Sequence, residues 1–216
     1  MAPHKQASFF LHPSTVKGLK EPYTELNITK KNTNKEYLLT SLGLSTSKKT
    51  LLVAIVVTKS WKDLSQEEKD MLVRSKEALV SVSSVSPVFV FADDALESKE
   101  FAGKYPYYLS SDDGITNVEL LSGADAFLFV EKKVRNSAMY MQRVLGFGGV
   151  VIAYKQKELP PFVEQYNPFT ERGSSFLYDQ YNPWSAFSEV VEVYGVFKFS
   201  YDWNTVRRRA MSSIHV

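Results

Sequence analysis

The sequence predicts an α/β domain with a single doubly wound parallel sheet, on the strength of three observations. Short runs rich in β-branched residues alternate with segments of helical periodicity. The first run, residues 51–57, is apolar at every position, as expected of a central strand covered by helices on both faces. The helical segments are about ten to fifteen residues long, which favours right-handed βαβ units.

Each element follows from its local pattern. A helix is predicted over 34–42, where Gly43 ends it. Ser65 is the predicted N-cap of a helix over 65–80, because acidic residues fill its first turn and apolar residues recur at helical spacing. Further strands are predicted at 87–91, 107–109, 126–130, 150–154 and 176–178. Further helices are predicted at 95–102, 115–122, 136–145, 183–193 and 203–211. Such a Rossmann-like sheet binds ligands beyond the carboxyl ends of its strands.

Composition excludes several classes of function. The chain has 216 residues, 44% of them hydrophobic, and no cysteine, which excludes disulfides, thiolate metal sites and cysteine nucleophiles. Its histidines, His4, His12 and His215, lie near the ends, so we expect neither a metal site nor a histidine-based triad. A net charge of +2 gives little attraction to nucleic acid or to an anionic membrane.

Location and surface are predicted from the same composition. No apolar stretch approaches the roughly 18 to 20 residues that cross a bilayer, and no secretory signal begins the sequence, so we expect a cytoplasmic protein without membrane contact. Residues 207–209 are three arginines, which are expected to face solvent near the negative end of a helix dipole rather than bind nucleic acid. Eight aromatic residues could supply a binding surface, although most are expected to pack internally: Trp61, Tyr105, Tyr107, Tyr108, Tyr166, Phe169, Tyr181 and Trp184.

Five segments, read in order, resemble one enzyme domain. They are NKEYLLTSLGL (34–44), SGADAFLF (122–129), MYMQRVLGFG (139–148), GSSFLY (173–178) and WNTVRRRAM (203–211). Together with the strand at 52–57 they resemble the C-terminal domain of starch and glycogen synthases, retaining glycosyltransferases of the GT-B type. The resemblance covers residues 30–211. It implies that 34–216 form one Rossmann-like half of a GT-B fold and that 1–33 are an N-terminal extension.

Departures from this family concern its charged residues. In active members the loop after the first strand carries an arginine and a lysine, which stabilise the charge that develops on a leaving nucleoside diphosphate. Here that loop, residues 58–64, has no arginine. Lys62, or less readily Lys59, could replace one cation, or both could be ordinary loop lysines. The family's glutamate near the donor sugar falls at Val134 instead.

Glu131 lies three residues before that position, and we expect it to form a solvated charge pair with Lys132 or Lys133 rather than act in catalysis. The family's glycine turn that presents backbone N–H groups to phosphate is replaced by residues 154–161, which contain no glycine. Lys155 and Lys157 in this loop could attract phosphate, or could simply be solvated.

Two functions follow from the resemblance. The favoured one is a non-catalytic binding or interaction module, a pseudoenzyme that contacts another protein or an α-glucan, because the arginine, the glutamate and the glycine turn are all lost. The alternative is the nucleotide-sugar-binding half of a split glucosyltransferase, which needs a separate N-terminal domain and binds ADP-glucose or UDP-glucose. No catalytic residue, metal or cofactor is predicted. The resemblance places six candidate residues near a nucleotide sugar, with the second pair beside the ribose: Lys59 and Lys62, Tyr140 and Gln142, Lys155 and Lys157.

Overall fold

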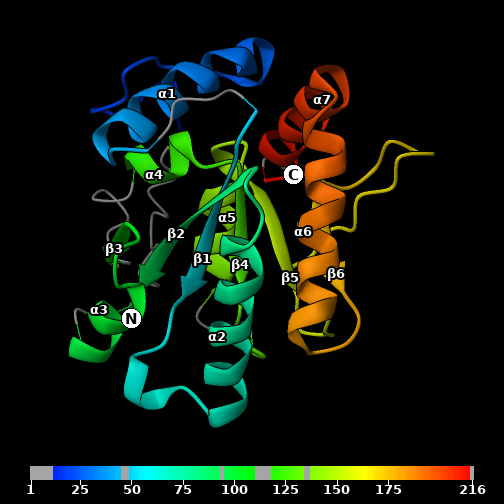
Figure 1. Ribbon diagram of the computed structural model, residues 1–216. Helices are drawn as coiled ribbons and strands as arrows, with labels where there is room; N and C mark the ends of the chain where they lie inside the picture. The colour runs from blue at the N-terminus through cyan, green and yellow to red at the C-terminus, as the bar shows by residue number, and fades with distance from the viewer. Residues whose placement is uncertain (1–11, 45–48, 93–94, 110–117, 134–136, 215–216) are drawn as a thin grey trace, which may run out of the picture.

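The computed structural model describes residues 12–44, 49–92, 95–109, 118–133 and 137–214. Six parallel strands form one sheet in the order β3-β2-β1-β4-β5-β6 (Figure 1). Their bounds are β1 (Leu51–Val57), β2 (Val85–Phe91), β3 (Tyr107–Leu109), β4 (Ala126–Phe129), β5 (Val150–Tyr154) and β6 (Ser175–Tyr178). This sheet confirms the predicted fold class.

Helices cover both faces of the sheet. They are α1 (Lys31–Ser41), α2 (Gln66–Val80), α3 (Leu96–Ala102), α4 (Val118–Gly123), α5 (Ala138–Gly146), α6 (Pro183–Phe197) and α7 (Ser200–Ser212). Two short 3-10 helices, η1 (Glu25–Lys30) and η2 (Trp61–Asp63), were not predicted. The predicted starts at residues 115 and 136 lie outside the described residues. Ser65 caps α2 as predicted, because its hydroxyl accepts from the Glu68 amide while the Glu68 carboxylate accepts from the Ser65 amide.

The sheet is doubly wound about β1. β1 pairs with β2 on one side and with β4 on the other, so the chain runs outward to β3, returns to the centre, and then runs outward to β6. Residues 51, 53, 55 and 57 pack against α2, α6 and α7, whereas residues 52, 54 and 56 pack against α1, α4 and α5. This two-faced burial explains why every position of β1 is apolar.

The segment before α1 packs onto the sheet domain. The Tyr23 hydroxyl, buried at 1% exposure, donates to the Phe147 carbonyl at 2.8 Å, and Ile28 packs against Met211 of α7. At the other end of α1, Gly123 allows a close approach, since a Cβ there would lie 2.5 Å from the Leu38 side chain. Contacts at both ends fix α1 beside α4, at the amino ends of the central strands (Figure 1).

None of the helices in the described ranges is both long enough and apolar enough to cross a membrane.

Candidate functional site

Glu131 lies two residues after the end of β4, at the carboxyl edge of the sheet. Hydrogen bonds from neighbouring segments converge on its side chain. Its side chain is buried at 3% exposure. The carboxylate accepts hydrogen bonds from the backbone N–H groups of Thr58 and Lys59 at 2.5 and 2.7 Å, and from the hydroxyls of Thr58 and Ser137, each at 2.7 Å. Glu131 therefore ties the loop after β1 to the start of α5.

The expectation that Glu131 forms a solvated charge pair is wrong. The Lys132 ammonium pairs instead with Glu67 at 2.9 Å, in an exposed contact. Four donors converge on the Glu131 carboxylate, and hydrogen bonds to an ionised group offset much of the cost of burying it. Sequence spacing could not show these donors, because Thr58 lies 73 residues away.

A second buried carboxylate, Glu68 of α2, adjoins the same loop. It accepts from the Lys59 ammonium at 2.6 Å, from the Ser65 N–H at 3.0 Å and from the Lys132 N–H at 3.2 Å. Burial alone would raise the pKa of Glu68, but the hydrogen bonds from Lys59, Ser65 and Lys132 together hold the pKa below its usual value. Glu68 is therefore ionised at neutral pH.

Two tyrosine hydroxyls donate hydrogen bonds to backbone carbonyls at the end of β4. The Tyr181 hydroxyl donates to the Val130 carbonyl at 2.6 Å, and the Tyr178 hydroxyl donates to the Phe129 carbonyl at 3.2 Å. Burial raises the pKa of both tyrosines, so their hydroxyls remain protonated donors. The chain's own side chains thus satisfy the backbone groups that end β1 and β4.

The four candidate lysines lie around this network in different ways. Lys59 is held at both its amide and its ammonium by the buried carboxylates. Lys62 is exposed in η2, and Lys157 is exposed in the loop after β5. Lys155 forms an exposed ion pair with Asp179 at 3.0 Å. Only Lys59 is joined to Glu131 and Glu68, and the role of all four toward a ligand stays a prediction.

The two candidates on α5 differ in burial. The Tyr140 ring is 5% exposed and packs edge to face against Phe127 and Phe129, while its hydroxyl has no hydrogen-bond partner among the described residues. Burial raises the pKa of Tyr140. Gln142 is half-buried. Position 134, where the family's glutamate falls, lies outside the described residues.

The described part of the chain brings no three histidine, cysteine or acidic side chains together in a group that could hold a metal ion. This edge provides two buried carboxylates and one lysine ammonium, held on the loops after β1 and β4 and on the first turn of α2. The amides of Thr58 and Lys59 already donate to Glu131, so they have no further proton to offer an external anion.

The sequence is similar to those of several glycogen synthases. The chain is 21% identical to glycogen synthase 1 of Synechocystis sp. over 192 residues, which cover 86% of the chain and 39% of that protein. It is 26% identical to the glycogen synthase of Gloeobacter violaceus over 207 residues, 94% of the chain and 44% of that protein. The chain is a distant homologue of the glycogen synthases. It spans less than half the length of these relatives, and no protein-family model matches it.

Solved structures agree on the fold. The chain superimposes on the catalytic domain of starch synthase IV from Arabidopsis thaliana, which was solved bound to ADP and acarbose, with a TM-score of 0.76 at 16% identity. The superposition covers 93% of the present chain and 42% of the starch synthase chain. Anabaena HepE in complex with UDP and glucose gives a TM-score of 0.56 at 13% identity, covering 83% of the chain and 46% of HepE. The fold is therefore that of one half of a GT-B glycosyltransferase.

Arg207 of α7 is buried rather than solvent-facing. The expectation that residues 207–209 face solvent is wrong for this arginine, which is 1% exposed. The sequence contains a signal for this burial. Trp203 lies four residues before Arg207 and Met211 lies four residues after it, so the three side chains share one face of α7. Arg209, in contrast, forms a partly exposed ion pair with Glu171 at 2.7 Å.

Proposed function

We propose that this chain is a non-catalytic glycosyltransferase-like binding module, related to the glycogen and starch synthases. The observation that carries the proposal is the position of the Glu131 carboxylate, which accepts from the Thr58 and Lys59 amides at 2.5 and 2.7 Å. The loop after β1 is where the family resemblance places the cations that face a departing diphosphate. Here a buried protein anion occupies the donors of that loop.

Two physical costs oppose diphosphate chemistry at this edge. Glu131 and Glu68 would repel a ligand of the same sign. Freeing the two amides for phosphate would leave the buried carboxylate with only its two hydroxyl donors. Each hydrogen bond lost to a buried charged group typically costs about 1.5 to 3 kcal/mol. Lys59 offers little compensation, because its ammonium is already paired with Glu68 at 2.6 Å.

The ligand that we propose for the module is an α-glucan, bound through Trp184. This side chain is 73% exposed at the start of α6 and borders a cavity of about 280 Å³ that Arg74, Glu77 and Phe187 also line. An exposed indole beside charged hydrogen-bonding groups suits the apolar face and hydroxyl rim of a sugar ring. Of the eight aromatic residues singled out in the sequence, Trp61 instead packs against Phe91 and Phe101.

Affinity electrophoresis through amylopectin tests this proposal, together with a glucosyl-transfer assay using ADP-glucose and UDP-glucose. We expect the wild-type chain to be retarded by the glucan, Trp184→Ala to lose the retardation, and the matched variant Phe169→Ala, at another exposed ring, to keep it. We expect no glucosyl transfer from either donor. Elongation of an α-glucan by this chain alone would overturn the proposal, as would equal retardation of Trp184→Ala and wild type.

The split-glucosyltransferase alternative has its own support. Two structural neighbours were solved with ADP or with UDP and glucose, and Lys62, Lys155 and Lys157 are exposed around the carboxyl edge. Calorimetry with ADP-glucose and UDP-glucose at millimolar concentration separates the two functions. Binding heat that is lost in the triple variant Lys62→Ala, Lys155→Ala, Lys157→Ala would favour the alternative. Absence of binding heat with both donors would reject the alternative for the chain by itself.

A further inference from the structure

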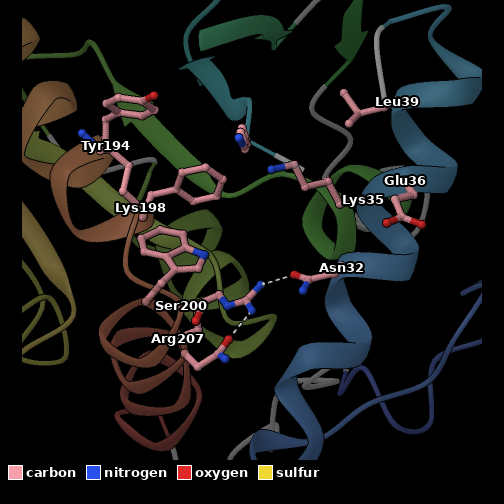
Figure 2. A pocket seen from close by; sticks show the side chains of 12 residues that line it. Asn32, Lys35, Glu36, Leu39, Tyr194, Lys198, Ser200 and Arg207 are labelled. Carbon is pink, nitrogen blue, oxygen red and sulfur yellow. Dashed lines mark hydrogen bonds between the residues drawn. The ribbon is translucent and has the colours of Figure 1, made fainter. Parts of the chain in front are cut away.

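A cavity of about 510 Å³ lies at the opposite edge of the sheet, between α1 and the junction of α6 with α7 (Figure 2). Its place is fixed by Lys35, one of its lining residues, whose ammonium contacts the Thr50 carbonyl at 2.6 Å and Asp125 at 2.5 Å. These two residues lie just before β1 and β4, so the cavity is at the amino ends of the strands. Its volume is in the range of small-molecule sites.

Arg207 lines this cavity with a buried guanidinium that forms no ion pair with a carboxylate of the described residues. Its Nη1 and Nη2 donate to the neutral side-chain oxygens of Asn32 at 3.1 Å and Asn204 at 2.5 Å (Figure 2). Its Nε has no hydrogen-bond partner among the described residues. Buried arginines are normally paired with an anion, so this one is an exception that calls for an anion from elsewhere.

The surrounding buried charges supply that anion only in part. Burial lowers the pKa of Arg207, and the negative charge of Asp125 offsets some of that effect without forming an ion pair with the guanidinium among the described residues. Lys35 pairs with Asp125, and the neighbouring Lys31, buried at 1% exposure, donates to the Leu121 carbonyl at 2.7 Å. Burial lowers the pKa of Lys31 well below its usual value, and the positive charge of Arg207 lowers it further. Even with Lys31 neutral, Asp125 is the one fully buried carboxylate that the described part of this cluster offers to Lys35 and Arg207. Glu36 of α1, an acidic residue that lines the cavity, is half-buried.

Residues that line the same cavity carry further donors without partners among the described residues. Helix α7 begins at Ser200, which lines the cavity, and the residue before it, Phe199, provides no side-chain cap for the first N–H groups. The indole Nε1 of Trp203, a buried lining residue, has no partner in the described part of the chain. The helix N-terminus, the guanidinium Nε and the indole N–H together make this wall rich in donors, which suits an oxyanion. The Nε and the indole N–H are buried, so an oxyanion reaches them only when neighbouring side chains shift.

The remaining lining residues indicate what carries the anion. Tyr194, Phe197 and Trp203 give the cavity three aromatic side chains. At its rim the exposed Lys49 and Lys198 outnumber one acidic residue, the half-buried Glu36. We propose that this cavity binds an oxyanion, phosphate or carboxylate, attached to an aromatic ring. The oxyanion pairs with Arg207 and the start of α7, while the ring packs against the aromatic side chains. This site is independent of the glucan surface at Trp184.

Calorimetry on the full chain tests the site with phenyl phosphate, benzoate, inorganic phosphate and uncharged phenol. We expect both ring-bearing anions to bind, at least about tenfold more tightly than inorganic phosphate, and phenol to give no heat. The charge-reversal variant Lys198→Glu at the rim should weaken phenyl phosphate at least about fivefold. The matched variant Lys104→Glu, another exposed lysine at the distant end of α3, should bind as wild type does.

Asn204→Asp is the sharper variant, because it supplies the missing carboxylate from within, at an atom 2.5 Å from the guanidinium. We expect it to raise the melting temperature in phosphate-free buffer and to weaken phenyl phosphate at least about tenfold. Asn167→Asp, in an exposed loop away from any helix start, adds the same charge elsewhere and should do neither. Absence of heat from every anion at about 10 mM, phenol binding as tightly as phenyl phosphate, or unchanged binding in Asn204→Asp would each overturn the proposal.

Discussion

The two edges of this sheet bury charge in opposite ways. At the carboxyl edge the Glu131 carboxylate has four hydrogen-bond donors, and Glu68 has an ammonium and two backbone amides. At the amino edge the Arg207 guanidinium has only two neutral amide oxygens, and its Nε is without a partner among the described residues. At the amino edge Lys35 and Asp125 do pair, so the difference between the two edges rests on the Arg207 guanidinium.

This difference indicates which buried charges stabilise the fold and which favour the binding of a ligand. A charge that the chain satisfies internally contributes to the fold and has little left to offer a ligand. A buried charge that is left without its counterion weakens the fold and gains most from an external partner. In a GT-B half the carboxyl edge is the expected ligand edge. In this chain the unsatisfied charge lies at the amino edge instead.

The largest effect should come from Glu131→Leu. The substitution leaves the amides of Thr58 and Lys59 and two hydroxyls without their acceptor, so we expect the free energy of unfolding in urea to fall by about 3 kcal/mol. The matched variant is Glu67→Gln, which breaks only the exposed ion pair with Lys132 and should change stability by less than about 0.5 kcal/mol. Equal losses in the two variants would mean that the carboxyl edge is not held by Glu131.

The sequence was sufficient for the sheet because the relevant signals are local. The seven apolar residues of β1 and the cap at Ser65 each determine a structure within a few residues of themselves, and both were predicted at the observed positions. The short 3-10 helices were not predicted, since one or two turns of three residues have too few positions to show a periodicity. The observed β2 begins two residues before the predicted start, because Val85 pairs with Leu51 of β1.

The candidate site was less predictable because its contacts are distant in sequence. Glu131 was read as solvated because the lysines next to it were visible in the sequence, whereas its donors at residues 58 and 59 were not. Arg207 was read as exposed from its two arginine neighbours, although its spacing to Trp203 placed it on the buried face of α7. A run of like charges shows only which residues are adjacent in the sequence. Whether a helical residue is buried depends instead on which face of the helix its side chain occupies.

A smaller effect, of opposite sign, should come from Glu189→Gln on α6. Burial, and then the negative charges of Glu192 and Asp179, raise the pKa of Glu189 to about 7, and its Oε2 has no partner among the described residues. A carboxyl whose pKa is raised in the folded state contributes stability at low pH that is lost as pH rises through about 7. The wild type therefore loses stability between about pH 4.5 and pH 7 from this group, whereas glutamine does not titrate.

Melting temperatures at about pH 4 and about pH 8 measure this effect. We expect Glu189→Gln to match the wild type at the lower pH and to be more stable by about 1 kcal/mol at the higher pH, since partial exposure screens the repulsion. Glu158→Gln, in an exposed loop, should match the wild type at both. A Glu189→Gln variant that is less stable at about pH 8 would show that this carboxylate has donors comparable to those of Glu131.

The smallest change should come from Arg207→Met, although Arg207 is among the largest fully buried side chains. Methionine keeps much of the apolar stem, removes the cost of burying an unpaired charge, and leaves Asn32 and Asn204 beside a cavity from which water can bind them. We expect urea denaturation in phosphate-free buffer to show a change below about 1 kcal/mol in either direction. A loss near that of Glu131→Leu would mean that the guanidinium is already neutralised within the fold, and the contrast between the two edges would then fail.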